Sequence, residues 1–164
     1  MKINRALLTN GVSKQFEEDC DFTQIEFNPT HIKNIPFCHV KMTATDYETV
    51  LRIEFQIQAT VIGVCSYSLE DVELHYDLKD EISISDDPED VDCYYEKNVL
   101  IDLDPYILGI LLANVPVRII KDGAKLPQSG EGYTVMSEDE YEKEKKNETD
   151  HRWDALDDYD FSDK

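Results

Sequence analysis

Residues 51–61 constrain the fold more than any other stretch, because their side chains alternate between apolar and polar. A period of two over these eleven residues is typical of a half-buried antiparallel strand. The alternation resumes from Val72 to Leu78, after a short connection that contains Cys65. Two such strands around a short link predict a β-hairpin over residues 50–78, with Cys65 at its bend.

Neighbouring segments predict further strands of the same sheet. Residues 38–44 alternate again, and the strand after the bend is expected to run on to Ile84. The apolar residues of 99–103 predict another short strand, and Val117–Ile120 is a candidate edge strand. Asn28-Pro29 and Ile35-Pro36 are expected to bracket a loop, since the residue before a proline avoids the helical region.

One helix is expected over residues 105–114, where apolar side chains cover most of the circumference. Asp104 is its expected N-cap, Pro105 suits the first turn, and Pro116 ends it. Gly109, inside the helix, suggests close packing against a neighbour. The predicted fold class is α+β: an antiparallel sheet with one buried helix over residues 1–121, with curling toward a barrel left open.

The remainder, residues 122–164, is expected to form a loop and a polar, partly helical C-terminal extension that is packed on the domain or tethered to it. A glycine-rich loop comes first, and Ser137 with Glu140 forms a capping box that predicts a helix over 138–146. Residues 150–161 place Trp153 and Leu156 at helical spacing among acidic residues. Such an amphipathic segment either docks back on its own domain or awaits a partner.

Charge limits the possible partners. Thirty-six acidic residues against sixteen basic ones give a formal net charge of −20. This excess repels nucleic-acid phosphates, so direct RNA contact is possible but not favoured. Two interpretations stay open: the negative charge attracts a basic partner, or it only keeps the protein soluble.

The sequence offers no pattern for a metal, a cofactor or a catalytic centre. The cysteines lack zinc-binding spacing, and the acidic run over 85–92 lacks the glycine of a calcium loop. No motif joins a histidine to Cys65 or to a serine. We therefore expect neither an enzyme nor a cofactor. With no signal peptide and no long apolar run, a cytoplasmic protein that does not enter membranes is expected, with reduced and mostly buried cysteines.

Several short motifs follow one another in a fixed order from about residue 38 to residue 161. They are the bend Cys65–Glu70, Ile101–Ile107, Asn114–Pro116, Leu126–Gly130, Tyr133–Ser137 and a tail around Asp150 and Arg152. Together they resemble the YceD-like large ribosomal RNA subunit accumulation proteins, in their Gram-positive-type branch. In that family the bend usually reads C-x-R-[CT]-L; here Cys65 and Leu69 match, whereas Tyr67 and Ser68 depart from it.

The resemblance implies a non-catalytic factor for accumulation of 23S ribosomal RNA and assembly of the large ribosomal subunit. Combined with the charge, it predicts binding of a basic ribosomal protein or a pre-ribosomal particle. The alternative is an acidic protein that mimics nucleic acid and inhibits a DNA- or RNA-binding protein. The candidate partner-binding residues lie in the bend and in the tail: Cys65, Leu69, Glu70, Asp150, Arg152, Trp153 and Leu156.

Overall fold

The computed structural model describes residues 1–27 and 31–147. The chain divides into two compact units, Met1–Gly123 and Ala124–Lys164. The first unit contains the sheet and the helix α1, and the second contains the helix α2.

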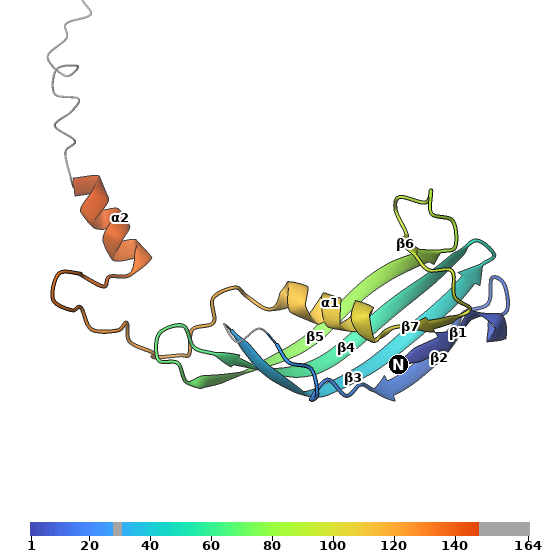
Figure 1. Ribbon diagram of the computed structural model, residues 1–164, viewed down its shortest axis with the longest axis horizontal. Helices are drawn as coiled ribbons and strands as arrows, with labels where there is room; N and C mark the ends of the chain where they lie inside the picture. The colour runs from blue at the N-terminus through green and yellow to red at the C-terminus, as the bar shows by residue number, and fades with distance from the viewer. Residues whose placement is uncertain (28–30, 148–164) are drawn as a thin grey trace, which may run out of the picture. The chain divides into compact units, whose positions relative to one another are not determined.

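The first unit is built on a five-stranded sheet in the order β2-β3-β4-β5-β6 (Figure 1). Neighbouring strands are antiparallel, except that β5 and β6 pair in parallel. The predicted hairpin and the α+β class are confirmed, with longer strands than the sequence indicated. The strands span Lys14–Asp19 (β2), Ile32–Tyr47 (β3), Val50–Val64 (β4), Asp71–Ser85 (β5) and Tyr94–Tyr95 (β6).

The alternation in β4 decides which face of the sheet is buried. Its apolar residues from Leu51 to Val61 are buried, whereas the polar residues between them are exposed or intermediate. The register between β4 and β5 runs without a shift and sets Ile57 beside Leu78 and Val61 beside Leu74. The apolar residues of both strands therefore share one face, although those of β5 from Val72 to Leu78 are only half-buried.

The sheet stays open, so the curling toward a barrel that the sequence left open does not lead to closure. Among the described residues β2 forms one edge, and the other edge belongs to β6 and to the part of β5 before Ile84. Strand β2 was not predicted, because Phe16 is its single apolar residue. Phe16 nevertheless packs against the core, and β2 pairs with the second half of β3.

A second, two-stranded sheet brings the start of the chain to the helix. Strand β1 (Lys2–Asn4) is followed by the 3-10 turn η1 (Arg5–Leu7) and pairs with β7 (Leu100–Asp102). The helix α1 (Asp104–Asn114) begins directly after β7. It buries Ile107, Ile110 and Leu111, which confirms the predicted helix and its buried apolar surface.

The predicted N-cap is wrong. Asp104 is the first helical residue, and Leu103 occupies the cap position without a side-chain bond to the helix. The carboxylate of Asp104 instead accepts a hydrogen bond from the N-terminal ammonium group of Met1. This contact arises because β1 pairs with β7 and the Leu103 amide donates to the Met1 carbonyl at 3.0 Å. The close packing suggested at Gly109 is also absent, since a Cβ there would meet nothing within 4 Å.

The loop expected between Asn28-Pro29 and Ile35-Pro36 is not found as predicted: Asn28-Pro29 lies outside the described residues, and Ile35-Pro36 lies inside β3. The register between β3 and β4 shifts between Asn34 and Phe37, and β2 pairs with β3 only from His39 onward. Proline is tolerated there because an irregular stretch of strand without a second neighbour loses no ladder hydrogen bond at that position.

The segment Val117–Ile120 does not form the expected edge strand. It follows α1 as an irregular stretch, and its contact with the sheet is made at the bend, where the Ser66 amide donates to the Ile119 carbonyl at 2.8 Å. Ile119 is 2% exposed and belongs to the core, so its side chain fixes the segment although the backbone joins no ladder.

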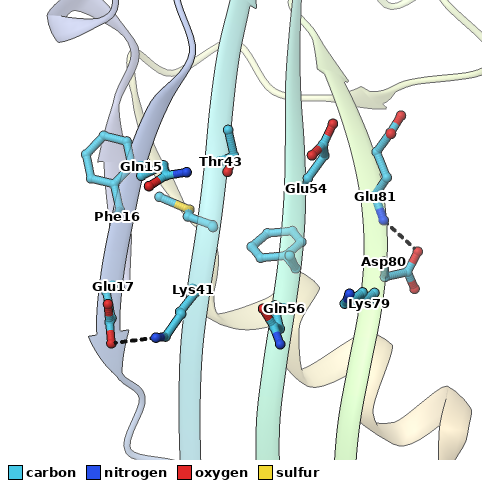
Figure 2. A pocket seen from close by; sticks show the side chains of 12 residues that line it. Gln15, Phe16, Glu17, Lys41, Thr43, Glu54, Gln56, Lys79, Asp80 and Glu81 are labelled. Atoms are coloured by element: carbon cyan, nitrogen blue, oxygen red, sulfur yellow. Dashed lines mark hydrogen bonds and ion pairs between the residues drawn. The ribbon is translucent and has the colours of Figure 1, made fainter.

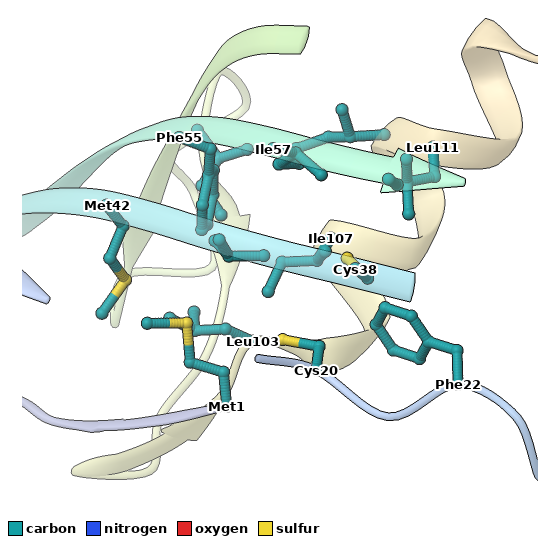
Figure 3. Packing of buried hydrophobic residues seen from close by; sticks show 14 of the residues in the cluster. Met1, Cys20, Phe22, Cys38, Met42, Phe55, Ile57, Leu103, Ile107 and Leu111 are labelled. Atoms are coloured by element: carbon teal, nitrogen blue, oxygen red, sulfur yellow. The ribbon is translucent and has the colours of Figure 1, made fainter. Parts of the chain in front are cut away.

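The core lies between α1 and the apolar face of the sheet. Figure 3 shows Leu103, Ile107 and Leu111 on the helical side and Met42, Phe55 and Ile57 on the strands, and all six are buried. Three cysteines are buried as well, and the fourth is intermediate. Two of the buried ones, Cys20 and Cys38, lie within this cluster, where the Cys20 amide donates to the Cys38 carbonyl at 2.8 Å.

The second unit contains a turn and one polar helix. The turn is closed by an isolated bridge between Gly130 and Tyr133, and α2 spans Glu138–Asn147. The predicted capping box is confirmed: the Ser137 hydroxyl accepts from the Glu140 amide at 3.2 Å, and the Glu140 carboxylate accepts from the Ser137 amide at 2.8 Å. The predicted amphipathic segment 150–161 lies outside the described residues.

Candidate functional site

The bend between β4 and β5 is held in one conformation by its own backbone. The Cys65 amide donates to the Glu70 carbonyl at 2.8 Å, and the Leu69 amide donates to the Cys65 carbonyl at 2.9 Å. Leu69 has a φ of 59°, in the left-handed region that costs a residue other than glycine about 1 kcal/mol. Its side chain is 77% exposed. Strained backbone of this kind clusters at functional sites, which makes the bend a candidate.

Cys65 links the bend to the segment that follows α1. Its side chain is buried, and its sulfur accepts hydrogen bonds from the amides of Lys121, at 3.4 Å, and Ser68, at 3.5 Å. These donors, with the Lys121 amide contributing most, lower the pKa of the Cys65 thiol to about 7. Because the sulfur accepts from amides on both sides, Cys65 serves as a structural link between the two segments.

Two basic side chains from that segment reach the bend. The Lys121 ammonium lies 2.8 Å from a Glu70 carboxylate oxygen and holds the pKa of Glu70 below its usual value. The Arg118 guanidinium lies over the Tyr67 ring, 5.3 Å from its centroid. The sequence analysis missed both residues, which lie about fifty positions from the bend. Arg118 thus brings a guanidinium to the bend through its contact with Tyr67.

Apolar side chains are exposed on both segments. Leu69 in the bend, Val117 at 87% and Ile120 at 46% are exposed, although the two segments are hydrogen-bonded to each other. Single exposed apolar residues are ordinary on a protein surface. Here three of them accompany the Arg118–Tyr67 contact, and aromatic and arginine side chains are enriched at the energetic centres of protein interfaces. The bend can therefore contact a protein partner through both apolar and charged groups.

The polar face of the sheet carries charges of both signs. It has a shallow open concavity of about 830 Å³, lined by side chains from four strands (Figure 2). Lys41 and Lys79 are the register neighbours of Gln56 on either side, and the Lys41 ammonium lies 3.3 Å from a Glu17 carboxylate oxygen. Because several charges here pair within the sheet, this concavity is not a uniformly charged surface.

His39 is part of these ion pairs. Its Nδ1 lies 2.6 Å from an Asp19 carboxylate oxygen and its Nε2 lies 3.0 Å from one of Glu17. The hydrogen bond with Asp19, and then that with Glu17, raise the pKa of His39 above its ordinary value. With both ring nitrogens engaged by carboxylates, His39 ties β3 to β2.

Of the predicted site residues, the structure brings Cys65, Leu69 and Glu70 together in one bend, with Cys65 buried and the other two exposed. The remaining four, Asp150, Arg152, Trp153 and Leu156, lie outside the described residues. Within residues 1–27 and 31–147 no group of three or more histidine, cysteine, aspartate or glutamate side chains is arranged to hold a metal ion. No helix in the same residues has the length and apolar character needed to cross a membrane.

The first unit is an open α+β sheet covered by α1, and its bend between β4 and β5 exposes Leu69 beside charged side chains. Residues 53–158 match the model of the family described as large ribosomal RNA subunit accumulation protein YceD, and the chain belongs to this family. It is 27% identical over 152 residues to the uncharacterized protein YlbN of Bacillus subtilis, covering 88% of this chain and 86% of that protein. No solved structure matches the chain.

Proposed function

We propose that the protein supports accumulation of 23S ribosomal RNA and large-subunit assembly by binding a basic ribosomal protein, without catalysing a reaction. Membership of the YceD family supports the ribosomal role. The net charge of −20 supports a basic protein rather than bare RNA as the partner, because complementary fields accelerate encounter whereas like charges oppose it.

Leu69 is the observation that carries the proposal. A leucine with a φ of 59° is unfavourable for folding because of backbone strain, and its 77% exposed side chain contributes little burial in return. Glycine would adopt the same φ without strain. A leucine in this position therefore supports a contact with a partner, in which its side chain is covered. Glu70, next to it, offers a carboxylate to a basic partner even though Lys121 already lies against it.

The test is to replace Leu69 by glycine. Leu69→Gly should change stability by less than about 1 kcal/mol, because the relief of strain is largely offset by the greater freedom of glycine in the unfolded chain. Retention of basic large-subunit proteins, identified by mass spectrometry after affinity purification of the full chain, should fall at least threefold. Val91→Gly is the matched control, since Val91 is a 92% exposed apolar residue in the loop after β5. Equal retention by wild type and Leu69→Gly would contradict the role of the bend.

Salt dependence tests the role of charge. Retention should be strong at about 50 mM salt and largely lost at about 500 mM, where the Debye length falls to a few ångströms. Capture of a nuclease or a transcription factor in place of ribosomal proteins would support the nucleic-acid-mimicking alternative and contradict the proposal.

The predicted tail residues need their own experiment. Deletion of residues 137–164 removes Asp150, Arg152, Trp153 and Leu156 together with α2. If these residues bind the partner, the deletion should abolish the retention that Leu69→Gly only weakens. Full retention by the truncated chain would confine the interface to residues 1–136.

A further inference from the structure

Strand β5 leaves most of one edge without a partner. Its fifteen residues all pair with β4, and no register shift interrupts the ladder. On its other side β5 pairs with β6 only through Ile84 and Ser85, and no other described strand pairs with residues 71–83 there. Along such an edge, alternate residues direct their amide and carbonyl groups away from the sheet. These groups form a template for an added strand.

This edge lacks most of the features that block an edge strand. Proteins protect edges with short strands, prolines, bulges, exposed charged side chains or charges that point toward the core. Of these, the stretch has only the exposed charges of Glu73 and Asp77, which oppose an acidic strand and not a basic one. Between Val72 and Leu78 the strand has no proline, no bulge and no inward charge. Asp80, opposite Phe55, is the first charged residue of β5 at a position on the core side of the sheet. The open stretch is therefore seven residues long, about 23 Å at 3.3 Å per residue.

The apolar side of this stretch is incompletely covered. Four side chains pack against the core and yet stay only half-buried, although their neighbours on β4 are buried. The difference follows from their position, because the four lie on the last long strand of the sheet. A strand added beside β5 would cover them with its own apolar residues. These four are Val72, Leu74, Tyr76 and Leu78.

The polar side of the same stretch is negatively charged. Asp77 has no ion-pair partner among the described residues, and Glu73 has only His75, with its Nε2 at 4.0 Å. Both carboxylates are exposed. The whole strand has five acidic residues and one lysine. A second copy of β5 would bring like charges side by side, which is destabilising, whereas lysine or arginine would be favourable there.

We propose that the β5 edge from Val72 to Leu78 binds an extended, basic segment of a partner protein as an added strand. The basic side chains of that segment face Glu73 and Asp77, and its alternate apolar side chains extend the surface formed by Leu74 and Tyr76. Main-chain hydrogen bonds supply the affinity, and the alternation of basic and apolar residues supplies the specificity. The inference rests on the proposed function only for the ribosomal identity of the partner.

A synthetic peptide tests the edge with the full chain. The probe is acetyl-Val-Lys-Val-Lys-Val-Lys-Val-amide, seven residues long like the open stretch, so that its lysines lie opposite residues 73, 75 and 77 and its valines opposite the apolar residues. Binding should slow amide hydrogen exchange in residues 72–78 at least tenfold, while exchange in β2 stays unchanged. The same peptide with glutamate in place of lysine should not bind. Protection of β2, or of no strand, would overturn the proposal.

N-methylation separates strand pairing from simple charge attraction. One version of the peptide is methylated on its lysine amides and another on its valine amides, so that each has one blocked edge and an unchanged charge. Because only one edge of an added strand faces β5, one version should bind like the parent and the other should lose binding at least tenfold. Equal binding of the two versions would overturn strand addition.

Charge reversal tests the polar side of the stretch. The variant with Glu73→Lys and Asp77→Lys should bind the peptide about tenfold more weakly at low salt. Its control carries Glu89→Lys and Asp92→Lys, in the exposed loop after β5. Each replacement removes one negative charge and adds one positive charge, so both double variants change the net charge from −20 to −16. Equal weakening in both variants would show general attraction and contradict a site at β5.

The peptide-binding and retention experiments together also separate this inference from the proposed function. Ribosomal proteins retained without protection of β5 would overturn the edge site and leave the proposed function standing. Peptide bound at β5 without retention of any ribosomal protein would support the edge site and contradict the proposed function.

Discussion

Replacing Gly63 by alanine should destabilise the first unit by loosening the segment that follows α1. Gly63 lies near the end of β4, beside the bend. A Cβ at this position would overlap the Cδ1 atom of Ile119 and would lie 3.1 Å from the His31 carbonyl oxygen. Ile119 is buried, and its carbonyl accepts the hydrogen bond from Ser66. Crowding at Ile119 therefore acts on the contact that fixes the bend.

The expected loss follows from two opposing effects. An added methyl group in a well-packed site costs about 1–3 kcal/mol. Alanine in a strand interior regains about 0.5–1 kcal/mol relative to glycine, because the unfolded chain loses freedom. The backbone at Gly63 has no positive φ, so alanine adds no strain there. We expect the free energy of unfolding to fall by about 1–2 kcal/mol.

A double-mutant cycle with Ile119→Val identifies the cause. Valine lacks the Cδ1 atom that meets the new methyl group, and alone it should cost about 0.5–1.5 kcal/mol. The double variant should be more stable than the sum of the two losses by about 1 kcal/mol, in urea unfolding followed by circular dichroism. Losses that add to within about 0.5 kcal/mol would refute the contact between residues 63 and 119.

Three further changes have definite directions. Gly109→Ala should raise the free energy of unfolding by about 1 kcal/mol in the same assay, because the site is helical and open, and a loss would contradict this. His39→Gln should remove a stabilising contribution that is full below pH 6.5 and disappears as the pH rises through the pKa of His39, which the hydrogen bond with Asp19 raises. The free energies of urea unfolding of variant and wild type should therefore differ more at pH 6 than at pH 9, and an equal difference at both would contradict this. Ser137→Ala should destabilise α2 by about 1 kcal/mol and reduce the helical secondary chemical shifts of its residues in NMR spectra. Unchanged secondary shifts would exclude the cap with Glu140.

The sequence predicted those parts of the fold whose signal is local. Side-chain alternation predicted the long strands, and the apolar run after Pro105 predicted α1. Strand β2 was not predicted, because its contact with the core depends on Phe16 alone and its place at the edge depends on pairing with β3. The prediction of Asp104 as the N-cap was wrong because of a tertiary contact: pairing of β1 with β7 brings the Met1 ammonium group to the Asp104 carboxylate.

The candidate site shows the same division. Cys65, Leu69 and Glu70 could be named as candidates because they lie within six consecutive residues and belong to a motif. Arg118 and Lys121 were missed, because only the folded chain brings residues from beyond α1 to the bend. The open edge of β5 could not be inferred either, since alternation reveals a strand but not which neighbours it lacks.

The most direct measurement of the central claim is a comparison of protein and RNA as ligands of the purified full chain. Fluorescence anisotropy would follow binding of individually purified basic large-subunit proteins and of a naked 23S ribosomal RNA fragment, at about 50 mM and about 500 mM salt. We expect at least one basic protein to bind at low salt and to be released at high salt, and the RNA fragment to stay unbound at both. Binding of the RNA fragment more tightly than every basic protein would contradict the claim.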